Sequence, residues 1–199
     1  YNNFVYDFLY PNPASVLAFI ENHDTDRFLG EGDNLPMLKQ ASTLLLTTRR
    51  IPQLYYGTEV MMNGVKSKSD GYVRKDFPGG WTGDATNALT PAGRTKIQNE
   101  CYDFYKTILN WRKGNDVIAK GNMVQFMVQN GVYAYARQYE GKTVFVMLNG
   151  TDAETTVPLK FYKEILKNSK QGKDILSGKA ITFGEELKMG PRESLVIEL

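Results

Sequence analysis

The stretch V-L-A-F-I-E-N-H-D-T-D-R-F, residues 16–28, decides the fold prediction because an apolar run changes abruptly into polar residues. The five apolar residues 16–20 are typical of a buried β-strand. Asn22, His23 and Asp24 follow at the carboxyl end of that strand. In parallel sheets, the loops at this end of the strands build the ligand site. The stretch therefore predicts a parallel sheet with a polar site at one edge.

Composition indicates a globular protein with a packed core, since 42% of the 199 residues are apolar. The formal net charge is only +2, without the basic clusters that a phosphate backbone requires, so we expect no nucleic-acid partner. No apolar run approaches the ~20 residues of a membrane span, and we expect no membrane partner. The lone Cys101 excludes an internal disulfide, and we expect it to be a packing residue on a helix.

The first part of the chain alternates short apolar runs with helical patterns, which predicts strand and helix units around a parallel sheet. Residues 35–50 fit a helix that begins near Asn34 and Pro36, and residues 51–56 form a second short apolar strand. A glycine-rich loop follows at residues 63–87; loops of that length are usually functional. Residues 92–113 then form an amphipathic helix with Thr90 as its expected N-cap.

The pattern changes after Asp116 to short β-branched and aromatic runs separated by turn signals. This spacing predicts an antiparallel β-sandwich of about seven strands, with one helical turn within residues 161–168. We therefore predict two parts, an α/β part at residues 1–115 and an all-β sandwich domain at residues 116–199.

The trio Asn22, His23 and Asp24 leaves several chemistries open. The simplest alternative is a structural one, in which the only histidine of the chain fixes a loop. A metal site is weakly supported because one histidine with Asp24 and Asp26 falls short of a zinc set, and the following residues do not fit a calcium loop. No nucleophile elbow for a serine-type triad is present.

A neutral, hydroxyl-rich ligand remains compatible with this trio, because histidine and carboxylate side chains hydrogen-bond hydroxyls. Aromatic side chains near the second strand end and in its loop can stack against sugar faces or serve only in packing; they are Tyr55, Tyr56, Tyr72, Phe77 and Trp81.

Three ordered motifs carry a family resemblance: F-I-E-N-H-D at residues 19–24, I-P-Q-L-Y-Y-G-T-E at residues 51–59, and the helix end at residues 108–113. They resemble the fourth sequence block, the eighth barrel strand and the last barrel helix of the alpha-amylase superfamily, glycoside hydrolase family thirteen. Arg50 stands where the family strand motif has a leading glycine. N-H-D-T-D-R-F and D-G-Y-V-R-K-D-F-P-G-G-W are most similar to the neopullulanase and cyclomaltodextrinase branch of the Bacteroidetes type.

The resemblance implies roles for the residues at the first strand end. Asp24 corresponds to the third catalytic carboxylate, a transition-state stabiliser, and His23 to the histidine that hydrogen-bonds the sugar hydroxyls. Asn22 belongs to the same substrate-binding block, and Tyr56 to the second strand motif.

In the loop, Asp70 and Arg74 match a family pair that contacts a glucose on the non-reducing side of the cut. Trp81 matches a substrate-binding tryptophan, but here it comes two residues later than in many relatives.

The resemblance also implies what the chain lacks. Retaining glycosidases need a nucleophile and an acid/base carboxyl about 5 Å apart, and in this family both come from barrel strands that precede residue 1. We therefore expect residues 1–115 to be the last two strand–helix units of a (β/α)8 TIM barrel, followed by the C-terminal β-sandwich. We expect the 199-residue chain to be inactive alone, and either to form a homodimer or to pair its unpaired sheet edge in another way.

The expected substrates of the full-length enzyme are α-glucan oligosaccharides such as maltodextrin, cyclodextrin and pullulan. The Bacteroidetes likeness implies a periplasmic or other exported location, with the signal outside this chain. No cofactor is assignable, and the family leaves Ca²⁺ open for the full-length enzyme. Two other hypotheses remain: a noncatalytic carbohydrate-binding or interaction module, and an unrelated barrel enzyme that uses His23 as general base.

Overall fold

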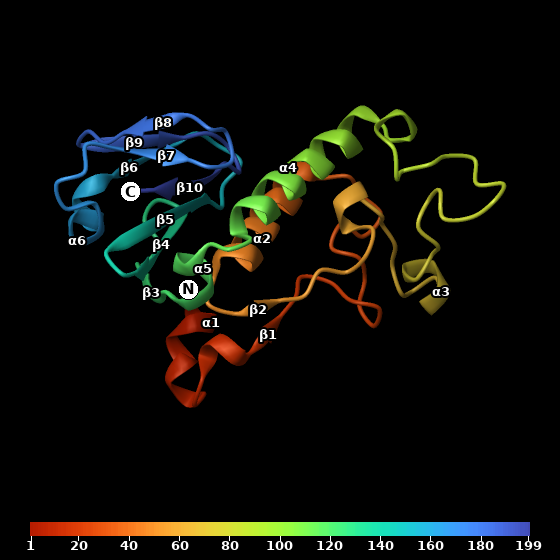
Figure 1. Ribbon diagram of the computed structural model, residues 1–199, viewed down its shortest axis with the longest axis horizontal. Coiled ribbons are helices and arrows are strands. Elements are labelled where there is room, and N and C mark those ends of the chain that lie inside the picture. Colours follow the sequence, from red (N-terminus) through yellow and green to blue (C-terminus); the bar gives the residue numbers. More distant parts are fainter.

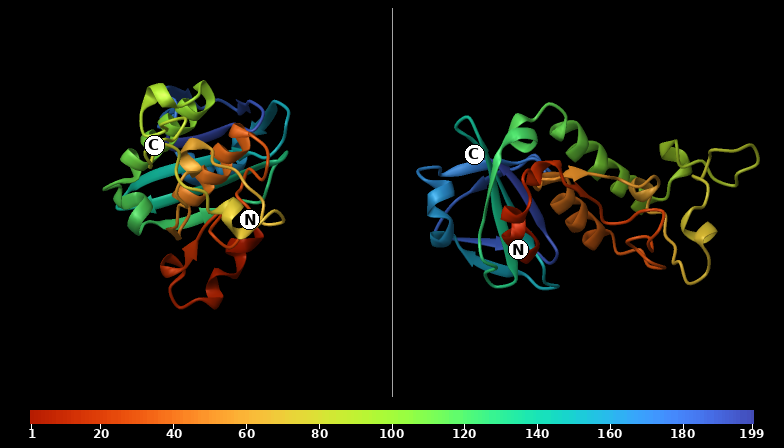
Figure 2. Two further views of the ribbon diagram at one scale, coloured as in Figure 1. Left: turned by 90° about the vertical axis from the view of Figure 1, so that its right-hand side faces the viewer. Right: turned by 90° about the horizontal axis from the view of Figure 1, so that it is seen from below.

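The computed structural model describes residues 1–199 and shows a β-rich body beside two long helices, with an extended loop beyond them (Figure 1). The β-rich body, the helices and the extended loop follow one another in this order along the long axis when the molecule is seen from below (Figure 2). None of the helices is long and apolar enough to cross a membrane.

The predicted parallel pair of strands is present but short. β1 (Leu17–Ala18) pairs in parallel with β2 (Ile51–Pro52), with Leu17 opposite Ile51. The expectation of a buried strand over residues 16–20 is wrong, because Leu17 and Phe19 are about half exposed. The physical reason is that β1 and β2 have no strand neighbours other than each other, so their outer edges and much of their surface face solvent.

An N-terminal segment lies beside these strands and consists of α1 (Asn2–Val5) and the 3-10 helices η1 (Tyr6–Leu9) and η2 (Pro13–Ser15). Asp7 is buried and forms ion pairs with Arg49 and Arg50. Burial opposes ionisation of Asp7, but the hydrogen bonds and charges of the two arginines outweigh it and lower its pKa. Arg50, which replaces the glycine of the family motif, thus fixes the N-terminal segment.

Two amphipathic helices, α2 (Leu35–Thr47) and α4 (Lys96–Arg112), form the middle layer. Asn34 caps α2, as predicted. The expected start of α4 at Thr90 is wrong: residues 91–93 form a 3-10 turn (η4, Pro91–Gly93), and Thr95 makes a capping box with Gln98. The buried faces meet in a small core with Leu38 and Leu46 on α2 and Cys101, Tyr105 and Ile108 on α4.

A sharp turn follows β2 at Gly57, whose φ is +84°. This φ favours glycine, and a Cβ atom there would lie 2.2 Å from the Sδ atom of Met62, so any other residue would also have to displace the Met62 side chain. The chain continues through η3 (Thr58–Val60) and α3 (Asp70–Val73) before it reaches the extended loop.

The C-terminal part is mostly antiparallel β-sheet, as predicted, but it begins with the short helix α5 (Asp116–Lys120) and has eight strands. The large sheet has the order β3-β4-β5-β10-β7-β8, and β6 and β9 form a second pair. The strands are β3 (Asn122–Gln125), β4 (Val132–Tyr139), β5 (Lys142–Asn149), β6 (Thr155–Pro158), β7 (Gln171–Asp174), β8 (Ala180–Thr182), β9 (Glu186–Met189) and β10 (Ser194–Glu198).

The sequence did not predict β7, because Q-G-K-D contains no β-branched or aromatic residue. The predicted helical turn is confirmed as η5 (Leu159–Tyr162) and α6 (Lys163–Leu166). The core between the two sheets contains Phe145 and Met147 from the large sheet and Val157 and Met189 from the β6–β9 pair.

Polar contacts join the helical layer to the sheet. The buried Arg137 on β4 donates to the carbonyl oxygens of Thr47 (3.0 Å) and Gly121 (2.7 Å). Burial lowers the pKa of Arg137 to about 10. The hydrogen bond from the Arg137 guanidinium to Thr47 satisfies the carbonyl group at the C-terminal end of α2.

Candidate functional site: a polar cluster at the β1–β2 edge

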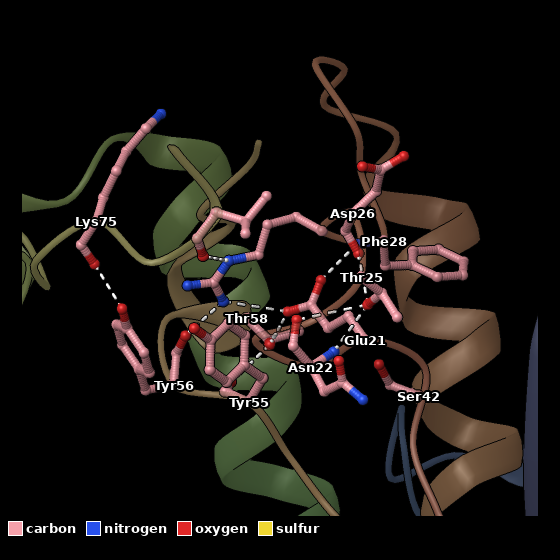
Figure 3. Close-up of polar contacts among 12 residues, drawn as sticks. Glu21, Asn22, Thr25, Asp26, Phe28, Ser42, Tyr55, Tyr56, Thr58 and Lys75 are labelled. Carbon is pink, nitrogen blue, oxygen red and sulfur yellow. Dashed lines mark hydrogen bonds and ion pairs between the residues drawn. The ribbon is translucent and has the colours of Figure 1, made fainter. Parts of the chain in front are cut away.

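The loops after β1 and β2 lie side by side (Figure 3). Arg74, at the C-terminal end of α3, contacts the first of these loops and completes the candidate site. Residues 21–28 follow β1, and Tyr55 and Tyr56 follow β2. The parallel pairing places both strand ends at the same edge. The site is thus assembled at the position that the sequence predicted.

Asn22 organises the first loop. Its Oδ1 accepts a hydrogen bond from the backbone N–H of Asp24 (2.8 Å), and its own N–H donates to Oγ1 of Thr25 (3.0 Å). These contacts form a compact turn that carries His23 and Asp24 at its outer side. Asn22 therefore stabilises the conformation of the first loop through hydrogen bonds within it.

His23, Asp24, Asp70 and Arg74 form one exposed cluster, which we call the His23 cluster. His23 Nε2 lies 3.1 Å from Asp24 Oδ2, and Arg74 Nη2 lies 3.0 Å from Asp24 Oδ1 and 3.3 Å from Asp70 Oδ2. Arg74 Nε also donates to the carbonyl oxygen of His23 (2.9 Å). The side chains of His23 and Asp24 are about 60% exposed, at 60% and 61%. The structure thus brings together four predicted site residues from two separate segments.

Lys66 is a member of this neighbourhood that the sequence did not predict. Its Nζ lies 3.3 Å from Asp70 Oδ1 and donates to the carbonyl oxygen of Asp24 (3.0 Å), while its backbone N–H donates to Asp26 (2.6 Å). The only available signal was its position four residues before Asp70, which is the spacing of a helical ion pair.

A buried polar network lies beneath the cluster, and the sequence did not predict it either. Glu21 and Arg27 are 2% and 1% exposed, and Arg27 Nη1 lies 3.3 Å from Glu21 Oε1. The hydroxyl of Thr58 and the backbone N–H of Phe28 also donate to the carboxylate of Glu21 (Figure 3). Glu21 immediately follows an apolar strand, and this position was a signal that the charge is buried.

The aromatic pair Tyr55 and Tyr56 lines the second strand end. The rings lie 4.7 Å apart in an edge-to-face arrangement, and the Arg27 guanidinium lies 3.9 Å from the centroid of Tyr55. The hydroxyl of Tyr56 donates to the carbonyl oxygen of Lys75 (2.7 Å), and the side chain is 42% exposed. Tyr56 therefore presents part of its ring beside the loop that carries Arg74.

Trp81 does not join the cluster in this structure. It is 68% exposed, and its backbone N–H donates to Asp84 within the same loop (3.1 Å). That loop, yellow-green at the right of Figure 1, runs away from the β1–β2 edge. The sequence pattern gave no information on this path because the loop has no periodicity.

The arrangement suits hydrogen bonding to a polyhydroxyl ligand better than it suits metal binding. No group of three or more His, Cys, Asp and Glu side chains is placed to hold a metal ion. An exposed imidazole, two carboxylates and a guanidinium offer both donors and acceptors, and Tyr56 adds an apolar surface. Such a mixture is typical of sites for neutral sugars.

Comparisons with known proteins define the class first. All 199 residues align with an Anoxybacillus alpha-amylase structure (TM-score 0.78, 20% identity, 41% of that chain). The alignment with the Geobacillus thermoleovorans alpha-amylase GTA, solved with acarbose, is similar (TM-score 0.77, 23% identity, all of this chain and 42% of that one). The chain therefore has the fold found in part of these alpha-amylases.

Sequence comparison then gives the family. Residues 123–198 match the cyclo-maltodextrinase C-terminal domain. An alpha-amylase of Niallia circulans is 31% identical over 176 residues, which cover 84% of this chain and 29% of that protein. A cyclomaltodextrin glucanotransferase of Thermoanaerobacterium thermosulfurigenes is 31% identical over 184 residues, or 88% of this chain and 22% of that protein. The chain belongs to the alpha-amylase superfamily and corresponds to a C-terminal portion of its members; it spans less than a third of these curated relatives.

Proposed function

We propose that this chain supplies the C-terminal part of an enzyme that cleaves α-glucosidic bonds with retention, and that Asp24 and His23 bind the sugar at the cleavage position. The observation that carries the proposal is the His23 cluster, in which Arg74 bridges Asp24 and Asp70 across two segments. The relatives named as an alpha-amylase and a cyclomaltodextrin glucanotransferase support an α-glucan as the substrate class.

In this proposal Asp24 acts by differential binding. Its carboxylate accepts hydrogen bonds from sugar hydroxyls more strongly as the ring flattens toward an oxocarbenium ion, so it stabilises the transition state without attack or proton transfer. His23 donates to hydroxyls of the same sugar. A carboxylate at this position also helps to keep a neighbouring acid carboxyl protonated, through like-charge proximity.

The remaining catalytic groups, a nucleophile Asp and an acid/base Glu, belong in this proposal to the chain that precedes residue 1. β1 and β2 are then the last two strands of a (β/α)8 barrel. Their open edges support this assignment, as do the exposed apolar side chains around them, which include Phe8 at 76%, Leu9, Tyr10, Leu17, Phe19 and Ile51. The isolated chain is then inactive and covers this surface by forming a homodimer.

The cyclo-maltodextrinase C-terminal domain match supports the neopullulanase and cyclomaltodextrinase branch. For the full-length enzyme we further propose maltodextrin, cyclodextrin and pullulan as substrates, and a periplasmic or other exported location. Asp70, Arg74 and Tyr56 then contact glucose units next to the cut. Trp81 contributes only if its loop moves toward the cluster.

The test is the variant Asp24→Asn in a longer protein that includes the preceding barrel residues. We expect hydrolysis of cyclodextrin to fall by roughly 10²- to 10³-fold or more, the scale for loss of one transition-state contact. Asp33→Asn, an exposed carboxylate in the loop before α2 that does not line the groove described below, is the matched control and leaves the rate unchanged. Equal activity of the wild-type protein and Asp24→Asn contradicts the proposal, and so does sugar release by the 199-residue chain alone.

One observation favours a second candidate, a noncatalytic carbohydrate-binding module. A groove of about 620 Å³ lies between α4 and the β-rich body, and its lining includes Lys39, Phe104 and Glu193. If this groove is the working site, Phe104→Ala abolishes binding of maltooligosaccharide to the chain and Asp24→Asn leaves it intact.

A further inference from the structure

Arg27 makes more contacts to separate segments than any exposed residue of the site. Its backbone N–H donates to the carbonyl oxygen of Gly64 (2.9 Å), and its Nε donates to that of Val73 (3.0 Å). Its Nη1 donates to the carbonyl oxygen of Tyr56 (2.6 Å) and lies 3.3 Å from Glu21. One buried side chain thus reaches the loop after β1, the end of β2 and the C-terminal end of α3.

Each of these partners stands next to a residue of the proposed sugar site. Val73 directly precedes Arg74, and Glu21 is two residues before His23. The carbonyl that Arg27 binds at the second strand end belongs to Tyr56 itself. Displacement of Arg27 therefore moves all three segments relative to one another.

The exposed contacts of the cluster are too weak to hold this arrangement. Arg74 and Asp24 meet at 3.0 Å, but their side chains are 40% and 61% exposed, and exposed pairs contribute little because of solvent screening. The buried contacts of Arg27 and Glu21 are not screened in this way. The buried contacts of Arg27 and Glu21 must therefore set the relative position of Asp24 and Arg74.

The packing around Arg27 is tight enough to transmit a small displacement. Its guanidinium stacks on Tyr55 at 3.9 Å. The neighbouring Gly64 approaches the chain so closely that a Cβ atom would lie 2.6 Å from the carbonyl oxygen of Tyr72. Arg27 Nη2 is buried without a hydrogen-bond partner.

We propose that Arg27 is a positioning residue of the sugar site, which fixes the first loop, Tyr56 and Arg74 in the geometry that binds the transition state. This inference rests on the proposed function for its chemical consequence. Lysine cannot replace Arg27, because an ammonium group lacks the planar set of donors that reaches several carbonyl oxygens at once.

The first experiment uses the 199-residue chain and does not depend on activity. His23 is the only histidine, so its imidazole resonances report on the site without ambiguity. In Arg27→Lys we expect the His23 signals and the backbone amides of residues 70–74 to shift. Arg94→Lys is the matched control, since Arg94 is also buried, stacks on Tyr102 at 3.9 Å and donates to the carbonyl oxygen of Ala88.

A fall in melting temperature of Arg27→Lys with unchanged His23 signals overturns the inference, because Arg27 is then only structural. If Arg27→Lys does not fold, Thr58→Val tests the same buried network from its Glu21 side, since it removes the hydroxyl that donates to Glu21 and to the carbonyl oxygen of Tyr55. We expect smaller shifts at His23 in that variant, and their absence also overturns the inference.

The second experiment uses the longer enzyme. A misplacement of about 1 Å in a catalytic group costs on the order of 10²-fold in rate. We expect Arg27→Lys to lower kcat by about 10- to 100-fold while KM changes by less than about threefold, the pattern of an interaction made in the transition state. An unchanged kcat overturns the inference. A wild-type enzyme without α-glucan activity contradicts the proposed function instead, and the His23 signals still test the role of Arg27.

Discussion

Glu21 and Asp24 are carboxylates three residues apart that differ sharply in environment, and this difference predicts that replacing each by its amide lowers stability by very different amounts. Glu21 is 2% exposed and pairs with the buried Arg27, whereas the Asp24 side chain is 61% exposed. Removal of one partner of a buried ion pair costs about 3–5 kcal/mol, because the other charge stays buried without compensation. Loss of an exposed pair costs about 0–1 kcal/mol.

We therefore expect Glu21→Gln to lower the free energy of unfolding of the 199-residue chain by about 3 kcal/mol, the lower end of that range, since Gln keeps one acceptor oxygen. For a chain of this size, 1 kcal/mol shifts Tm by about 2–4 °C, so the expected fall is roughly 6–12 °C. Asp24→Asn should change Tm by less than about 4 °C.

Urea unfolding and thermal melting followed by circular dichroism, at one fixed protein concentration, measure both values. The concentration must be fixed because self-association raises apparent stability. Equal losses in the two variants, or a larger loss in Asp24→Asn, would refute the assignment of Glu21 to the support of the site and of Asp24 to its exposed surface.

Three further outcomes follow from the fold. The folded-state pKa of Asp7 lies below its unfolded value. Its ion pairs therefore stabilise the protein above pH ~4, and this stabilisation is lost as the pH falls through the folded-state pKa. Urea titrations from pH 2.5 to 6 should show that Asp7→Asn removes this part of the pH dependence of stability. Gly57→Ala should destabilise the chain by about 1–3 kcal/mol more than Gly114→Ala, which has a similar positive φ but open space at its Cβ, because the Met62 side chain must move; equal losses would argue against the close turn after β2. Burial raises the pKa of Cys101 to about 12, so a thiol reagent at pH 8 should label the protein in urea and not in the native state; rapid native labelling would contradict the packing of α4.

The parts of the fold that sequence predicted were those with periodic patterns. The helices α2 and α4 and the antiparallel C-terminal strands follow apolar periods of 3.6 and 2, and the structure confirms them within a few residues. The start of α4 was missed because Pro91 and Thr95 offer competing start signals, and only the capping box at Thr95 decides between them. β7 was missed because its residues are polar and glycine-containing.

In the candidate site too, the sequence identified residues in local motifs but did not predict the long-range contacts. Local motifs named His23, Asp24, Asp70 and Arg74, and the structure brings them together, with Arg74 in contact with Asp24 and Asp70. Sequence did not give the buried support, because the contacts of Arg27 to residues 56, 64 and 73 are long-range and are made by backbone carbonyl groups. It also did not give the path of the loop around Trp81, where no periodicity or cap fixes the conformation.

The most direct test of the central claim is a crystal structure of the longer protein with a bound α-glucan oligosaccharide. We expect the carboxylate of Asp24 and the imidazole of His23 to lie within hydrogen-bond distance of hydroxyls on one glucose unit, with Arg74 still bridging Asp24 and Asp70. An oligosaccharide bound only in the groove that Lys39, Phe104 and Glu193 line, with the His23 cluster free of sugar, would contradict it.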